Sequence, residues 1–226
     1  PGAPPMGSNP VDPWEAFNRK VFAFNDALDE AILKPVATAY RDNVPSLIRR
    51  GVDNVLGNIG DLWSAANHFL QGKFQTGVEM TARVAINTTA GIGGLLDPAT
   101  EMRLPRLSED FGQTLGRWGV GPGPYVVLPL WGPRTLRDSF ALAADLQFEP
   151  SRLPATETGR YTVSALSVLN TRTNLLAASD LLNQAALDRY SFLRDAYLQK
   201  RLDAIYDGAP PLETFDDEPE DGKPKK

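Results

Sequence analysis

Residues 12–28 read Asp-Pro-Trp-Glu-Ala-Phe-Asn-Arg-Lys-Val-Phe-Ala-Phe-Asn-Asp-Ala-Leu, and this stretch favours a helix. Asp12 followed by Pro13 is typical of a helix start, because aspartate caps free amides and proline fits the first turn. Apolar side chains then recur every three or four residues, at Trp14, Phe17, Val21, Phe24 and Leu28. We expect this first helix to end before Pro35, whose ring disfavours a helix interior.

The same apolar period returns along most of the chain. We expect further helices at residues 48–59, 61–70, 76–85, 135–144, 157–187 and 188–206. Asp61 and Thr76 are predicted to cap two of them. No Asn-Gly or Asp-Gly hairpin signal separates two strand-like runs. The sequence therefore predicts an all-α single domain of about seven helices.

The two ends of the chain differ from the body in composition. Residues 1–11 are rich in proline and glycine, and residues 208–226 carry six of the 28 acidic residues. We expect a flexible leader at 1–11, a helical domain at 12–207 and a disordered acidic tail at 208–226.

Composition excludes several kinds of chemistry. The 226 residues include no cysteine, so thiol nucleophiles and cysteine-ligated metals are impossible. The net charge is −5, and no basic patch favours nucleic acid. The single histidine, His68, has no nucleophile or orienting acid marked by a motif, so we expect an ordinary surface or capping histidine. We expect no catalytic residue, metal or cofactor; a helical hydrolase that uses His68 is the competing enzyme hypothesis.

Residues 97–132 lose the helical period and are rich in glycine and proline, which suggests a functional loop. Within this region, residues 118–133 carry no charge for 16 positions and include Trp118, Gly121, Gly123 and Tyr125. If exposed, such a stretch forms an apolar patch that favours contact with lipid or a partner. Burial under helices and an active-site lid are the alternative interpretations.

Several uncommon strings, in the same order along the chain, resemble the VacJ/MlaA lipoprotein family between about residues 12 and 206. The strings are Asp12-Pro-Trp-Glu-Ala-Phe-Asn-Arg19, Phe22-Ala-Phe-Asn25, Lys34-Pro-Val-Ala37, Tyr40-Arg-Asp42, Phe69-Leu-Gln-Gly72, Arg83 with Asn87-Thr88, Gly91-Ile-Gly-Gly-Leu-Leu-Asp97, Asp110-Phe-Gly-Gln-Thr-Leu-Gly-Arg-Trp-Gly-Val-Gly-Pro-Gly-Pro-Tyr-Val-Val-Leu-Pro129 and Gly132-Pro-Arg-Thr-Leu-Arg-Asp138.

The resemblance implies a helical ring in the periplasmic leaflet of the outer membrane, with a central amphipathic channel. It further implies removal of misplaced phospholipid from the outer leaflet, delivery to a soluble periplasmic carrier, and association with trimeric porins, without covalent chemistry. Members of the family are anchored through an N-terminal cysteine; this chain begins at Pro1 without one, and we expect the full-length form to carry the anchor. The alternative is an adaptor lipoprotein that only binds porins.

Candidate site residues follow from these patterns. Asn18 and Asn25 are seven residues apart and therefore share a helix face, adjacent to Phe24. For the lipid channel and its gating we expect Asn18, Phe24, Asn25, Gly91, Gly94, Trp118, Gly121, Gly123 and Tyr125. In the acidic tail we expect carrier binding by Leu212, Phe215, Asp216 and Asp217, with the acids steering a basic partner.

Overall fold

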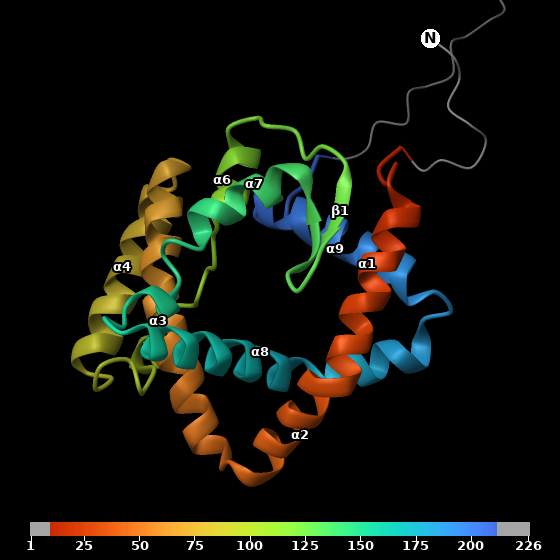
Figure 1. Cartoon of the computed structure of the whole chain (residues 1–226). Helices are drawn as coiled ribbons and strands as arrows, with labels where there is room; N and C mark the ends of the chain where they lie inside the picture. The colour runs from red at the N-terminus through yellow and green to blue at the C-terminus, as the bar shows by residue number, and fades with distance from the viewer. Residues whose placement is uncertain (1–9, 212–226) are drawn as a thin grey trace, which may run out of the picture.

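The computed structural model describes residues 10–211, apart from the side chain of Ala185. Figure 1 shows its elements arranged as a ring around a central opening. The long helices α1 (Glu15–Leu28), α3 (Ser46–Leu70) and α8 (Glu157–Ala185) border three sides, and the segment from α6 to α7 closes the fourth. The expectations for residues 1–9 and 212–226 lie outside the described residues.

The chain does not leave the helical path at Pro35. α1 continues through a five-residue π-helix (Asp29–Leu33) directly into α2 (Lys34–Asn43), so the expected end before Pro35 is wrong. A π-turn widens the hydrogen-bonding register locally, which removes the need for the bond that proline cannot donate. The expected cap is also wrong, because α1 starts after Trp14 without a side-chain cap and Asp12 is buried.

α3 and α4 (Phe74–Thr89) form an antiparallel pair on one side of the ring. Asp61 does not begin a helix; it lies inside α3, buried, with its carboxylate 3.3 Å from Arg83 Nε and 3.0 Å from Arg106 Nε. The expected break is absent because tertiary ion pairs hold this carboxylate within the helix. Thr76 lies in the first turn of α4 and not at its cap, and its hydroxyl reaches the Lys73 carbonyl.

The Gly/Pro-rich region contains short elements that the sequence did not predict. After α5 (Pro98–Glu101) and α6 (Phe111–Arg117), strands β1 (Tyr125–Leu128) and β2 (Gly132–Thr135) form an antiparallel hairpin. The expectation of no strand pair is therefore wrong. Its turn uses Leu130 (φ 69°) and Gly132 (φ 73°) in the left-handed region instead of an Asn-Gly pair.

The C-terminal half follows the sequence prediction closely. Thr135 caps α7 (Leu136–Asp145) by accepting the amide of Asp138, and a 3-10 turn (Pro150–Arg152) separates it from α8. The last helix, α9 (Arg189–Ile205), runs beneath the hairpin, where Tyr125, Val127 and Tyr190 form a small apolar core. The predicted all-α architecture is confirmed, with one two-stranded sheet added. Within residues 10–211 no helix combines the length and apolarity needed to cross a bilayer.

Candidate functional site

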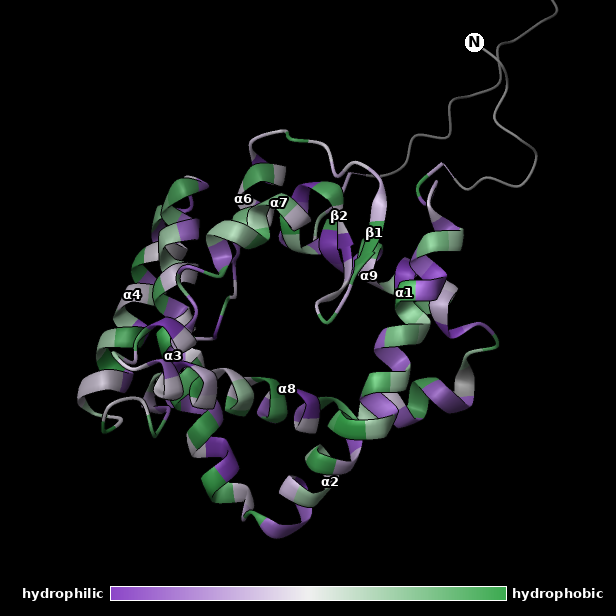
Figure 2. Ribbon diagram, in the orientation of Figure 1, coloured by the Kyte–Doolittle hydropathy of each residue, from purple (hydrophilic) through white to green (hydrophobic). Residues whose placement is uncertain are grey.

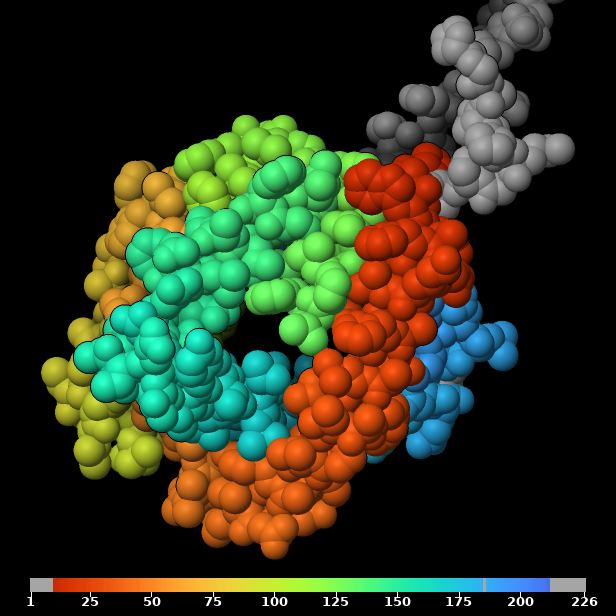
Figure 3. Space-filling view, viewed as in Figure 1, coloured from red at the N-terminus to blue at the C-terminus, as the bar shows by residue number. Residues whose placement is uncertain are grey.

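The β1–β2 hairpin borders the central opening. Figure 3 shows a hollow in the middle of this face, framed by the hairpin in green, α1 in red and orange, and α8 in teal. The hairpin turn carries two large apolar side chains, Leu130 and Trp131, which are 67% and 51% exposed. An apolar tip with this exposure can meet whatever occupies or surrounds the ring.

Two asparagines of α1 hold the hairpin by its backbone. The Asn18 amide donates to the Tyr125 carbonyl (3.1 Å) and accepts from the Val127 N–H (2.9 Å). The Asn25 amide repeats this pattern with the Leu128 carbonyl (3.0 Å) and the Leu130 N–H (2.9 Å). Each side chain thus imitates the donor–acceptor pair that a neighbouring strand would offer. Asn18 covers the free edge of β1, and Asn25 holds the end of β1 and the turn.

The spacing of the two asparagines matches the strand. Seven residues of α-helix rise about 10.5 Å at 1.5 Å per residue. Three residues of strand, from Tyr125 to Leu128, extend about 10 Å at roughly 3.3 Å per residue. The two lengths match, so two asparagines on one helix face reach two points of the hairpin that are about 10 Å apart. Asn18 is fully buried, so it holds the hairpin from the protein interior.

The structure brings some of the other predicted residues to this corner. Tyr125 is buried in the core with Tyr190, and Phe24 is exposed on α1 beside Asn25. Gly121 and Gly123 precede β1; Gly121 faces open space, whereas Gly123 has φ 66° and lies against Leu136.

Trp118, Gly91 and Gly94 lie elsewhere. Trp118 directly follows the last residue of α6, and its indole N–H donates to the Leu70 carbonyl at 3.0 Å. Gly91 and Gly94 belong to the turn after α4, on the α3 side of the ring. A Cβ on Gly91 would lie 2.4 Å from the Asn87 carbonyl oxygen, and one on Gly94 (φ 87°) would lie 3.1 Å from Asn58 Cβ. Both glycines therefore close a tight turn.

The described part of the molecule buries many polar and charged side chains and exposes many large apolar ones. Its buried residues include Asp12, Asn18, Asp61, Asn67, Arg83 and Asp138, all almost inaccessible. Large apolar residues are instead exposed along the helices, among them Phe17, Phe24, Leu47, Ile48, Phe74, Val78, Phe140, Tyr161 and Leu181. Figure 2 shows apolar residues on every helix of the ring. So much exposed apolar surface marks contact with a membrane or another protein.

Two buried ionic clusters hold the scaffold. On one side, Arg83 of α4 joins Asp61 of α3 to Asp97 before α5, and Asn87 donates to Asp97 at 2.9 Å. Burial acts to raise the pKa of Asp97, but hydrogen bonds from Thr100, Asn87 and Arg83 outweigh it and lower the pKa to about 2.

On the other side, Arg201 of α9 joins Asp110 and Asp138, the latter at 2.9 Å, and Tyr197 Oη donates to Asp138 at 2.7 Å. Burial alone would raise the pKa of Asp138, but the Arg201 charge reverses this and lowers it.

Comparison with known proteins identifies the family. The model of the MlaA lipoprotein family matches residues 10–204.

This chain belongs to the MlaA lipoprotein family.

Its relatives include the intermembrane phospholipid transport system lipoprotein MlaA of Escherichia coli K12, 41% identical over 197 residues, covering 84% of this chain and 76% of the relative. The protein of the same name from Haemophilus influenzae is 30% identical over 209 residues, covering 87% and 80%.

A solved structure, described as the structural basis for maintenance of bacterial outer membrane lipid asymmetry, superposes on this MlaA family member with a TM-score of 0.75. It is 38% identical in sequence and covers 86% of this chain and 98% of the other. The family resemblance and the helical fold predicted from the sequence are both confirmed by these matches.

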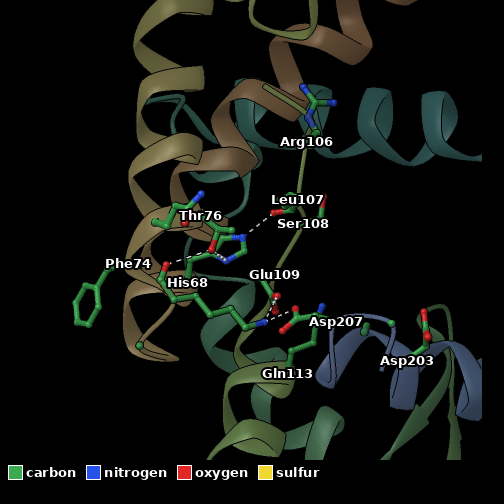
Figure 4. A pocket seen from close by; sticks show the side chains of 15 residues that line it. His68, Phe74, Thr76, Arg106, Leu107, Ser108, Glu109, Gln113, Asp203 and Asp207 are labelled. Atoms are coloured by element: carbon green, nitrogen blue, oxygen red, sulfur yellow. Dashed lines mark hydrogen bonds and ion pairs between the residues drawn. The ribbon is translucent and has the colours of Figure 1, made fainter. Parts of the chain in front are cut away.

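His68 is buried in this MlaA family member, and the expected surface position is wrong. Its Nε2 lies 3.0 Å from the Leu107 carbonyl and its Nδ1 2.9 Å from the Thr76 hydroxyl (Figure 4). Because a carbonyl only accepts, Nε2 of His68 donates to Leu107, and Nδ1 contacts the Thr76 hydroxyl. Both ring nitrogens are therefore used to join α3, α4 and the segment before α6.

The surrounding pocket, of about 840 Å³, is lined by charged, polar and apolar residues together. Figure 4 shows Glu109 and Asp207 converging below His68, where Lys73 Nζ lies 2.9 Å from Glu109 and also pairs with Asp207. These charges compensate one another and join the α3–α4 turn to the end of α9. Among residues 10–211, no carboxylate is hydrogen-bonded to the His68 ring, and its two partners, the Leu107 carbonyl and the Thr76 hydroxyl, do not make a triad with it.

Sequence reasoning missed the hairpin tip and its exposed Leu130. The signal that could have found it is the run Tyr125-Val-Val-Leu128, bounded by Pro129 and Gly132, which has strand propensity between turn residues.

Proposed function

We propose that this chain moves phospholipid at the outer membrane: it removes misplaced phospholipid from the outer leaflet and passes it to a soluble periplasmic carrier through the central opening. The single observation that supports this best is a ring with an opening that exposes many large apolar side chains and buries clusters of charged ones. A lipid surface stabilises the exposed apolar side chains. The relatives named for intermembrane phospholipid transport support the substrate class.

The ring is proposed to lie in the periplasmic leaflet, held by its apolar faces and by a lipid anchor in the full-length form. The hairpin tip, Phe24, Asn25, Gly121 and Gly123 form the proposed lining and gate, and Asn18 and Tyr125 position the hairpin. Away from it, Trp118 ties the end of α6 to α3, and Gly91 and Gly94 shape the turn after α4. Transport of an intact lipid makes and breaks no covalent bond, and the engagement of both His68 nitrogens supports a non-enzymatic role.

Two protein partners belong to the proposal. A trimeric porin is proposed to cover part of the exposed apolar surface, and the carrier is proposed to be recruited by Leu212, Phe215, Asp216 and Asp217. These tail residues lie outside the described residues, so the tail proposal rests on its acidic, amphipathic sequence alone.

A disulfide lock tests the proposed gate. Residues 1–226 contain no cysteine, so Asn25→Cys with Leu130→Cys adds one pair of thiols to them, at a point where the Asn25 side chain accepts from the Leu130 N–H at 2.9 Å. In cells that lack their own family member, the oxidised double variant is expected to leave phospholipid in the outer leaflet. Reductant should restore its removal.

Each single cysteine variant is the matched control, because it removes the same native side chain without a bond. Locked protein that clears outer-leaflet phospholipid at the normal rate would contradict a moving hairpin. If purified protein captures a porin but neither binds nor transfers phospholipid, the adaptor alternative replaces this proposal.

A further inference from the structure

A second cavity, distinct from the central opening, lies between α3 and the start of α8. It measures about 780 Å³ and is lined by the lower half of α3, the turn after α4, the 3-10 turn and α8. Its walls are apolar, with Leu47, Val52, Val55, Leu96, Leu153 and Leu166 among them. We name it the α3–α8 groove.

Close approach of the chain to α3 forms the floor of this groove. Gly51 is buried in α3, and a Cβ there would lie 2.8 Å from Leu95 Cδ1. The Asn54 amide donates to the Leu95 carbonyl at 3.0 Å, which fixes the turn against the helix. The polar groups on this wall are thus already hydrogen-bonded, and the remaining surface is hydrocarbon.

Only two charged residues line the groove, and they differ in their partners. Asp97 is neutralised by Arg83. Arg50 is exposed, and among residues 10–211 no carboxylate forms an ion pair with it. The α3–α8 groove therefore combines a long apolar surface with one uncompensated cation.

We propose that the α3–α8 groove binds a phospholipid, with an acyl chain along Val52, Val55 and Leu166 and the phosphate on the Arg50 guanidinium. This inference rests on the proposed function and adds a holding site beside the ring. A phosphate on Arg50 makes charge-assisted hydrogen bonds. A peptide fits less well, because its backbone amides would lose water in a groove that offers them hydrocarbon.

The test uses the full chain in detergent micelles with a phosphatidylglycerol that carries a photoreactive group in its acyl chain. Photolabelled peptides are expected from residues 47–56 and 150–166. Val52→Trp fills the groove and should lower this labelling about tenfold, because the acyl chain then loses roughly the burial of one apolar side chain's surface. Val78→Trp, on the exposed surface of α4, is the matched control and should leave labelling unchanged.

The charge is tested separately. Arg50→Glu should lower labelling by phosphatidylglycerol about tenfold, because a charge-assisted bond is lost, while labelling by the matching diacylglycerol stays the same. Lys200→Glu, an exposed cation on α9, is the control for net charge. If Val52→Trp perturbs the circular dichroism spectrum, Leu153→Trp blocks the groove from its other wall.

Groove labelling that is insensitive to both tryptophan variants overturns the groove site. Phosphatidylglycerol labelling that Arg50→Glu does not lower overturns it as well. Phospholipid transfer by the same protein separates this idea from the channel. If the protein transfers phospholipid but the groove is not labelled, only the proposed groove site is overturned. If the groove is labelled but no phospholipid is transferred, the groove site stands and the proposed transport through the central opening is overturned.

Discussion

The two sides of the ring are held together by different chemistry. On the α3–α4 side, Arg83 bridges two carboxylates, Asp61 and Asp97, inside the protein. On the α1 side, the amides of Asn18 and Asn25 bind backbone groups of the hairpin, and Asn18 also donates to the buried Asp12 carboxylate at 2.8 Å. Breaking a buried ion pair costs about 3–5 kcal/mol, whereas a neutral hydrogen bond contributes about 1 kcal/mol.

This difference indicates which part can move. The α3–α4 side behaves as a rigid frame, because separating it would leave buried charges uncompensated. The hairpin can exchange its amide contacts for water at its exposed tip at lower cost, since Leu130 and Trp131 already face outward. Elements that move in function come from the low-stability part of a fold. Four predictions test this contrast.

The largest effect is expected for Arg83→Met. It removes the cation between Asp61 and Asp97 and should lower the free energy of unfolding by about 3–5 kcal/mol. Denaturant unfolding in micelles, followed by circular dichroism, measures the loss. Arg103→Met removes an exposed arginine and should change stability by less than about 0.5 kcal/mol. Equal losses for both variants would refute the rigid frame.

Asn18→Ala should destabilise the hairpin side by about 3 kcal/mol, because it leaves the Tyr125 carbonyl, the Val127 N–H and the Asp12 carboxylate short of a partner. Amide hydrogen exchange should accelerate at Val127 before it changes in α4. Asn43→Ala, which removes an exposed amide from the end of α2, is the control. Uniform acceleration over the whole ring would argue against an independently held hairpin.

Acid should weaken the α3–α4 side. The pKa of Asp97 falls from its ordinary 3.8 to about 2 in the folded protein. A lowered carboxylate pKa stabilises the fold above pH 3.8, and this contribution, about 2 kcal/mol, disappears as the pH falls through 2. Asp97→Asn should flatten the stability profile between pH 4 and 2. An unchanged acid profile in this variant would show that Asp97 does not couple to folding.

The smallest effect is expected for Gly121→Ala, at less than about 0.5 kcal/mol, because a Cβ there meets only open space. Gly94→Ala is the contrasting substitution, since φ is 87° and the added Cβ would lie 3.1 Å from Asn58 Cβ. Thermal unfolding of the two variants compares an open segment before the hairpin with a closed turn of the frame. A larger loss for Gly121→Ala would mean that its segment is packed.

Much of this protein follows from local sequence. The apolar period predicted α7 to within about two residues, and the helical stretches expected after Pro154 match α8 and α9 equally closely. The uncommon strings gave the family. The asparagine pair was recognised as sharing one face because seven residues make nearly two helical turns.

The tertiary structure decided what those residues contact. The partners of Asn18 are 107 and 109 positions away, and Asp61 meets an arginine 22 positions away. No local period encodes such partners, so the hairpin, the uninterrupted α3 and the burial of Asp12 and His68 escaped prediction. The sequence by itself determined the helices and the family, through short-range spacing. The burial and pairing of polar groups far apart in the sequence determined the ring, the frame held by buried ion pairs and the hairpin held by hydrogen bonds.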